Sequence, residues 1–288
     1  MNITELFRQK PVVFSFEIFP PKRDSAIDTI WSTLAQMEAL GPDFISVTYG
    51  AGGGGGKSYT AQIAGAIQKK YGITPLAHLT CIGSTRAEVE ESLQELREEG
   101  VENILALRGD KIPGVEPKTD FLHASDLIAF IREQGGFSVS GACYPEVHTE
   151  APDPITDIRN LKKKVDAGAG HLVSQLFFDN GAFYSFVERA RIAGITVPIE
   201  AGIMPVVNAR QILRMVSLCG ASLPPKFTRM ISRFEQNPTA LRDAGIAYAI
   251  DQIVDLIAQG VEGIHLYTMN DPDVARRISQ AVENLRKG

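Results

Sequence analysis

Apolar and polar positions alternate along this chain in a way that separates short buried segments from longer amphipathic ones. The short apolar runs span residues 12–18, 43–48, 75–80, 103–110, 137–145, 171–178, 197–205 and 263–270. Between them, apolar residues recur at helical spacing at about 25–40, 58–71, 85–100, 124–133, 154–167, 182–193 and 272–286. Strand followed by helix, repeated eight times, predicts an α/β fold of the (β/α)8 TIM-barrel type.

The connection between the seventh and eighth strands is longer than the others. Residues 208–260 contain two helical segments, one ending before Pro238 and one at about 239–258. We therefore predict extra helices between strands 7 and 8. The chain of 288 residues fits one barrel, which typically needs ~250 residues, and no linker composition interrupts it. The expected organisation is a single domain over residues 1–288.

Composition narrows the class of protein. The net charge of −5 argues against nucleic acid and anionic membranes as partners, and no apolar run reaches the ~18 residues of a membrane span. The N-terminal segment is polar, without a signal-peptide core, which favours a cytoplasmic location. Cys81, Cys143 and Cys219 are far apart and odd in number, so we expect buried thiols rather than disulfides or a zinc site.

Nearly every apolar run ends in a polar or ionisable residue. Barrel enzymes build their active sites at the C-terminal ends of the strands, so these endings are candidate site residues. They are Glu17, Thr48, His78, Arg108, Asp110, Tyr144, His148, Gln175 and Tyr267.

Glu17 stands between Phe16 and Ile18 in an apolar strand. Burial among such neighbours disfavours the carboxylate and favours the protonated acid, which suits a general acid near neutral pH. The alternative is a glutamate that points to solvent at the end of the strand.

Two further groups of candidates follow the fourth and fifth strands. In Arg108-Gly109-Asp110, arginine can pair with a phosphate or carboxylate, glycine permits close approach, and aspartate can accept hydrogen bonds from a heterocycle. Residues 144–148 add a stacking ring, a carboxylate and an imidazole. His78 and His148 could in principle bind a metal, but no ligand spacing supports this, and we expect no metal site.

Two segments allow alternative interpretations. Residues 51–58, AGGGGGKS, fit a relaxed phosphate-loop pattern, but Ala51 stands where glycine is required and the barrel pattern argues against this fold. A turn that brings backbone close to a ligand is the favoured interpretation. On the predicted helix 154–167, Asp157, Asn160, Lys163 and Lys164 share one face. That face is either a surface salt-bridge face or a diphosphate or ribose site.

Taken together, the motifs resemble those of the bacterial methylenetetrahydrofolate reductases over nearly the whole chain. They occur in the order expected for that family. The motifs are SFEIFPPK, FISVTYGAGG, HLTC, ILALRGD, HASDLI, YPEVH, DIRNLKKKVDAGA, SQLFFD, GIMPV and HLYTMN.

The resemblance implies a flavoprotein of one-carbon metabolism that binds FAD and passes hydride from NADH or NADPH to 5,10-methylenetetrahydrofolate. By this likeness Glu17 is the general acid, Asp110 orients folate and tunes the flavin, and Gln175 and Tyr267 contact the substrate. The implied FAD contacts are Thr48, Tyr49, Ala51, His78, Arg108, Gly109, Asp110, Ala124, Tyr144, His148, Ala151, Asp157, Asn160, Lys163 and Lys164.

Three positions depart from the family pattern. His123 stands where tyrosine is common, Ala209 where some members place phenylalanine, and Asp271 where some have arginine. These departures leave the substrate contacts and the electron donor open. Some members work with a separate iron–sulfur subunit, so a flavin-binding electron-transfer subunit with such a partner is the alternative function. We expect a homo-oligomer.

Overall fold

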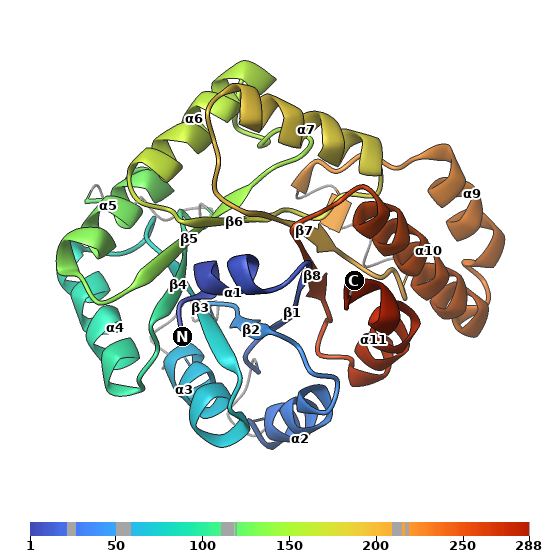
Figure 1. The fold of residues 1–288 in the computed structure, drawn as a ribbon, viewed down its shortest axis with the longest axis horizontal. Helices are drawn as coiled ribbons and strands as arrows, with labels where there is room; N and C mark the ends of the chain where they lie inside the picture. The colour runs from blue at the N-terminus through green and yellow to red at the C-terminus, as the bar shows by residue number, and fades with distance from the viewer. Residues whose placement is uncertain are drawn as a thin grey trace.

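The computed structural model describes residues 1–21, 27–49, 59–110, 118, 120–208, 215–216 and 219–287. Ala51, the rest of the 51–58 segment and Ala209 lie outside the described residues. The strands form one closed parallel barrel in which each pairs with its sequence neighbours and β1 pairs with β8 (Figure 1). The predicted (β/α)8 barrel is confirmed. The strands are β1 (Val13–Ile18), β2 (Phe44–Val47), β3 (Thr74–Thr80), β4 (Asn103–Leu107), β5 (Ser138–Cys143), β6 (His171–Ser174), β7 (Ile199–Ile203) and β8 (Gly263–Tyr267).

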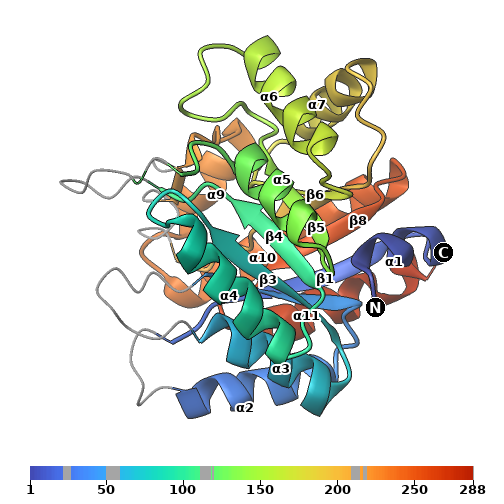
Figure 2. The ribbon, with the colours of Figure 1, turned by 90° about the vertical axis from the view of Figure 1, so that its left-hand side faces the viewer.

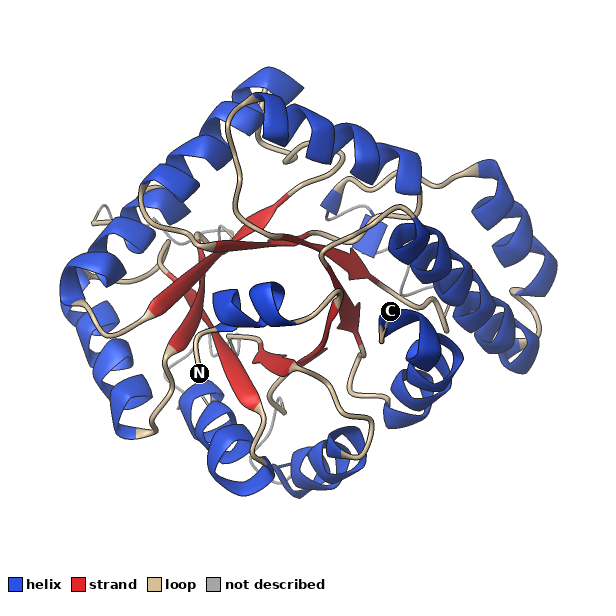
Figure 3. Cartoon of the chain, in the orientation of Figure 1, coloured by secondary structure: helices blue, strands red, loops and turns tan. Residues whose placement is uncertain are grey.

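Helices surround the strands as an outer layer (Figure 3). They are α2 (Ile27–Glu38), α3 (Thr60–Tyr71), α4 (Arg86–Glu98), α5 (Ala124–Gln134), α6 (Pro154–Asp166), α7 (Asn180–Ile192), α9 (Pro225–Phe234), α10 (Pro238–Ala258) and α11 (Pro272–Arg286). The helices α9 and α10 lie between β7 and β8, as predicted. None of the helices in these ranges is long and apolar enough to cross a membrane.

Local signals set several helix boundaries. At the start of α4, Thr85 and Glu88 form a reciprocal capping box, which satisfies backbone N–H groups that have no partner within the helix. At the start of α6, the Asp153 side chain accepts hydrogen bonds from the backbone N–H groups of Ile155 and Thr156. The cap therefore fixes where α6 begins, and with it the helix face that turns towards the barrel.

One helix was not predicted. The segment α1 (Ile3–Gln9) lies across one end of the barrel, on the side of the chain termini (Figure 2). Its Ile3 and Leu6 are buried in a cluster with barrel residues such as Phe44 and Leu76. Because Val13 at the N-terminal end of β1 belongs to the same cluster, α1 seals the N-terminal end of the barrel with apolar side chains.

The three thiols are free. Cys81 and Cys143 are buried as expected, whereas Cys219 is only half-buried. Burial raises the pKa of Cys81 to about 12, so this thiol stays protonated and unreactive near neutral pH.

Candidate active site

The carboxyl group of Glu17 lies inside the barrel. Its Oε2 atom is 3.6 Å from Nε2 of His78 and 3.6 Å from Nε2 of His265, and its side chain is 19% exposed. The neighbouring Phe16 and Ile18 pack into the core, so strand alternation turns Glu17 towards the interior. The alternative of a solvent-facing glutamate is therefore wrong.

His78 supplies an imidazole beside this carboxyl group. Burial lowers the pKa of His78 to about 4, although the Glu17 carboxylate raises it, so His78 is neutral near neutral pH. Its Nε2 atom is buried and has no hydrogen-bond partner among the described residues. Because a buried polar atom without a partner is costly, this nitrogen is a candidate contact for a bound molecule.

The Arg108-Gly109-Asp110 segment follows β4. The Arg108 guanidinium donates two hydrogen bonds to the Glu150 carboxylate, at 2.6 and 2.8 Å, and this pairing raises the pKa of Arg108. Gly109 has a φ of 86°, and a Cβ there would lie 3.1 Å from Cβ of Thr80. Glycine therefore permits the turn that leaves Asp110 exposed beyond the strand.

A second cluster joins the end of β5 to α6. The rings of Tyr144 and His148 meet edge to face with centroids 4.6 Å apart, and Nζ of Lys164 lies 5.6 Å from the Tyr144 ring centroid. Lys164 donates to the carbonyl of Ala142 at 2.8 Å, and Asp157 accepts from the His148 backbone N–H at 3.3 Å.

Burial governs the electrostatics of this second cluster. It lowers the pKa values of Lys164 and His148, raises that of Asp157, and raises that of Tyr144 to about 12. The cluster therefore offers a neutral ring with a neighbouring amine and carboxyl group.

The four residues predicted to share a face of α6 separate into two pairs. Asp157 and Lys164 are half-buried against the second cluster, whereas Asn160 and Lys163 are exposed and joined by a 3.2 Å hydrogen bond. No ion pair joins two of these four described side chains. The surface ion pair on this side of α6 is instead Lys162 with Asp166.

The other expected cofactor contacts also lie near strand ends. Thr48 follows β2 and accepts a hydrogen bond from the Thr60 hydroxyl through its carbonyl oxygen, and Tyr49 packs against the core. Ala124 is the buried first residue of α5, and the Ala151 N–H donates to the carbonyl of His148. These residues follow the C-terminal ends of their strands, and their contact with a cofactor stays a prediction.

The proposed substrate side lies across β6, β7 and β8. The Tyr267 hydroxyl donates to the carbonyl of Ser174 at 2.7 Å, and the Gln175 backbone N–H donates to the carbonyl of Cys143 at 2.7 Å. A Cβ at Gly202 would lie 2.3 Å from the Ser174 carbonyl oxygen and 2.8 Å from the Tyr267 ring. Glycine at this position therefore makes room for the Tyr267 ring over the barrel.

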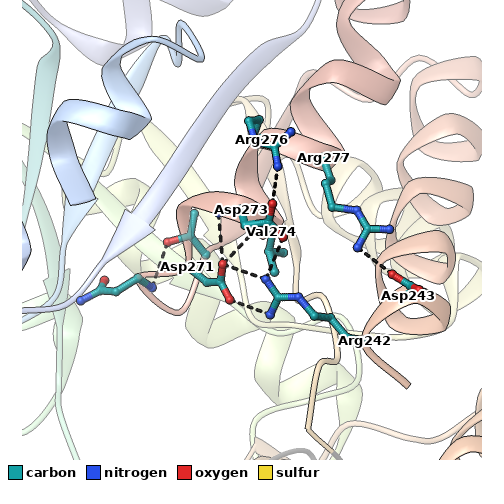
Figure 4. A network of polar contacts seen from close by, with 9 residues as sticks. Arg242, Asp243, Asp271, Asp273, Val274, Arg276 and Arg277 are labelled. Atoms are coloured by element: carbon teal, nitrogen blue, oxygen red, sulfur yellow. Dashed lines mark hydrogen bonds and ion pairs between the residues drawn. The ribbon is translucent and has the colours of Figure 1, made fainter. Parts of the chain in front are cut away.

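Two of the departures from the family pattern have structural roles. Asp271 caps α11 by accepting from the backbone N–H groups of Asp273 and Val274, and it also receives two hydrogen bonds from Arg242 of α10 (Figure 4). The carboxylate of Asp271 is thus occupied within the fold. His123 is the exposed residue that precedes α5, and its backbone N–H is bound by the Asp126 carboxylate at 2.9 Å.

The sequence analysis missed a set of polar residues inside the barrel. Each belongs to an apolar run and is buried in the barrel: Ser15, Ser46, Ser140, His171, Glu200 and His265. A usable signal was present, because Ser15 precedes Glu17 by two residues and His265 precedes Tyr267 by two, which places each pair on one side of its strand.

A closed parallel barrel with titratable side chains gathered at the C-terminal strand ends defines the chain as a barrel enzyme. The sequence profile of the family described as "Methylenetetrahydrofolate reductase" matches residues 2–283. The 5,10-methylenetetrahydrofolate reductase of Pectobacterium carotovorum subsp. carotovorum is 37% identical over 264 residues, which cover 92% of this chain and 88% of that protein. The chain belongs to the methylenetetrahydrofolate reductase family of oxidoreductases, which confirms the resemblance found in the sequence.

Two further comparisons describe its relatives. Methylenetetrahydrofolate reductase (NADH) 1 of Arabidopsis thaliana is 35% identical over 287 residues, and the match covers 93% of this chain and 48% of the plant protein. The chain thus spans about half the length of that relative. A solved structure of an uncharacterised protein from Clostridium thermocellum that binds two copies of 5-methyl-5,6,7,8-tetrahydrofolic acid has a TM-score of 0.67 at 13% identity. It covers 99% of both chains and supports the fold alone.

Proposed function

We propose that this protein reduces 5,10-methylenetetrahydrofolate to 5-methyltetrahydrofolate with bound FAD and with NADH or NADPH as the electron donor. The observation that carries the proposal is the Glu17 carboxyl group between two imidazoles inside the barrel, in a chain of this family. The family match and the similarity to a bacterial 5,10-methylenetetrahydrofolate reductase support the substrate class.

The residues present fit a flavin. His78 offers a buried nitrogen that has no hydrogen-bond partner in the part of the chain that the structure describes, Gly109 permits close approach, and Tyr144 offers a ring surface. Exposed Lys163 and Asn160 would bind the diphosphate and ribose, since cations and amides suit these groups. When bound, FAD would supply the hydride-transfer chemistry.

The protein itself must supply a proton. Reduction adds one hydride and one proton to the folate, and opening its imidazolidine ring requires protonation of a ring nitrogen. Glu17 is the proposed donor of that proton. Asp110, exposed at the end of β4, would orient the folate, and Gln175 and Tyr267 would contact it.

The alternative is a flavin-binding electron-transfer subunit on the same fold that depends on an iron–sulfur partner. The family membership favours the reductase itself. The choice between NADH and NADPH, a homo-oligomeric assembly and a cytoplasmic location stay predictions.

The test is an anaerobic experiment in two halves on the purified protein. Its visible spectrum should show oxidised flavin, alone or after addition of FAD. NADH or NADPH should bleach that spectrum, and methylenetetrahydrofolate should restore it with formation of 5-methyltetrahydrofolate. A protein that binds FAD but is reduced by neither nicotinamide would support the electron-transfer alternative, and a protein that binds no flavin would refute both.

A further inference from the structure

A polar cluster lies inside the barrel directly below Glu17. We call it the interior cluster, and it consists of Ser15, His171, Glu200 and His265, all fully buried. The Ser15 Oγ atom lies 2.7 Å from Oε1 of Glu200 and 2.6 Å from Nδ1 of His265. The other Glu200 oxygen, Oε2, lies 3.4 Å from Nε2 of His171.

Glu200 has an unusual charge environment. Among the described residues, neither lysine nor arginine forms an ion pair with it, and the ring nitrogens nearest to its Oε2 atom are Nε2 of His171 at 3.4 Å and Nδ1 of His265 at 3.9 Å. A buried carboxylate is strongly disfavoured unless protons or cations nearby compensate it. The hydrogen-bond donors available to Glu200 are therefore the Ser15 hydroxyl and the N–H groups of these two imidazoles.

The Ser15 hydroxyl has a single proton, so it can donate to Glu200 or to His265 but not to both. When Glu200 is ionised, Ser15 donates to Glu200 and must accept from Nδ1–H of His265. A neutral His265 then has its lone pair on Nε2, the atom that faces Glu17 at 3.6 Å. An acceptor in that position favours the protonated form of Glu17.

The opposite arrangement has the opposite effect. If Glu200 were protonated, it would donate to Ser15, and Ser15 would donate to Nδ1 of His265. Nε2–H of His265 would then face Glu17 and favour its carboxylate. The protonation states of Glu200 and Glu17 are thus opposed through two intervening side chains.

We propose that Glu200 is a positioning residue that holds the Glu17 proton in place, acting through Ser15 and His265. This inference rests on the proposed function, because it assigns Glu17 the role of acid. In each turnover Glu17 would lose one proton to the folate nitrogen and regain one from solvent at the mouth of the barrel. Glu200 changes the equilibrium of that proton and gains or loses no atom.

The side chains around His265 come from several strands. Two of these side chains stay neutral near neutral pH. His78 of β3 stays neutral because burial lowers its pKa to about 4, and Tyr267 of β8 stays neutral because burial raises its pKa well above 10. Ser46 of β2 has its hydroxyl 3.3 Å from Nε2 of His265 and does not titrate. The other ionisable groups beside His265 are Glu17, at 3.6 Å, and Glu200, at 3.9 Å, and His171 lies 3.4 Å from Glu200.

The experiment compares Ser15→Ala and Glu200→Gln with wild type. The rate of flavin reoxidation by methylenetetrahydrofolate is measured against pH under anaerobic conditions. In each variant the pH midpoint of this step should fall by about one unit, a tenfold change in proton occupancy. In the double variant the shift should be smaller than the sum of the two, because both residues act along one path. Flavin reduction by the nicotinamide should keep its pH profile.

Ser174→Ala is the matched control. Ser174 is also a fully buried hydroxyl of the barrel, and it accepts from the Gly202 N–H at 2.9 Å. Its loss should lower stability without moving the pH midpoint.

Nitrogen-15 NMR of the imidazoles gives a readout that does not depend on turnover. The chain has five histidines, so single His→Gln variants can assign the signals. His265 should carry its proton on Nδ1 in wild type and lose that preference in Ser15→Ala.

Unmoved midpoints in both folded variants, or fully additive shifts, would overturn the role of Glu200. Glu17→Gln separates this failure from that of the proposed function. If Glu17→Gln stops the folate step while the other variants leave the midpoint in place, the positioning role alone is wrong. If Glu17→Gln retains a rapid folate step, the assignment of the acid fails, and the inference fails with it.

Discussion

Replacement of Glu17 by glutamine should separate the two half-reactions. Glutamine is close to glutamate in size, so the packing of Phe16 and Ile18 should survive, but it cannot supply a proton. General acid catalysis is typically worth ~10²–10⁴-fold, or about 3–5 kcal/mol. We expect the upper end of that range, because two of the groups near Glu17, His78 and Tyr267, cannot replace the acid. His78 is already deprotonated near neutral pH, and the Tyr267 hydroxyl is bound to the Ser174 carbonyl with a strongly raised pKa.

The assay is anaerobic stopped flow on the flavin absorbance. Reduction by the nicotinamide donor should stay within about tenfold of wild type, since hydride transfer to the flavin needs no acid at the folate. Reoxidation by methylenetetrahydrofolate should fall by roughly 10⁴-fold. Glu102→Gln, an exposed change at the opposite end of the barrel, controls for the substitution itself. Equal slowing of both half-reactions would show that Glu17 is structural and would refute this reasoning.

Three further predictions concern the cofactor and stability. Lys163→Ala should weaken FAD binding about tenfold, as expected for the loss of one charge-assisted hydrogen bond, whereas Lys162→Ala should leave it unchanged. Both affinities are measured by titration with FAD. Equal affinities of the two variants would show that Lys163 is not part of the cofactor site. Asp110→Asn should raise the flavin midpoint potential by roughly 20 mV, or about 1 kcal/mol for two electrons, because a nearby carboxylate disfavours reduced flavin. An unmoved or lower potential in a redox titration would count against a position of Asp110 near the flavin. His78 binds a proton in the unfolded chain below pH 6.5 but in the folded chain only near pH 4, so folding stability should drop by about 3 kcal/mol as pH falls across this window. In chemical unfolding, His78→Gln should flatten that slope and His123→Gln should not; a slope unchanged in His78→Gln would contradict the neutral buried imidazole.

The fold was predictable because parallel barrel strands are buried on both sides and read as apolar runs separated by helical segments. The structure confirms all of those runs as strands, with shorter bounds for all but β3, which begins one residue earlier, at Thr74. The run at 103–110 ends as a strand at Leu107, since Gly109 turns the chain. The helix α1 was missed because its few apolar residues, among them Ile3 and Leu6, stand among charged ones and gain their role only by packing against the barrel end.

The site was predictable only in part. Strand-end residues such as Glu17 and Tyr267 could be found because the barrel rule assigns function to those positions. The side chains that contact these residues could not be found, because they come from distant parts of the sequence and meet only in the folded structure. Asp271 is held by Arg242, which lies 29 residues away in sequence, and Glu17 faces His265, which lies on the last strand.

The layers of the barrel interior also bear on why polar residues persist there. The lowest layer, with Phe44 and Leu76, is apolar and sealed by α1, which shows that this chain can fill its barrel with hydrophobic side chains. One layer higher, the interior cluster replaces such side chains with buried titratable groups, although a well-packed apolar layer is often as stable or more stable than buried charges. Stability alone therefore gives no reason for the cluster. Its place directly below Glu17, with a hydrogen-bonded path that ends at the imidazole facing that carboxyl group, gives a reason in the control of one proton.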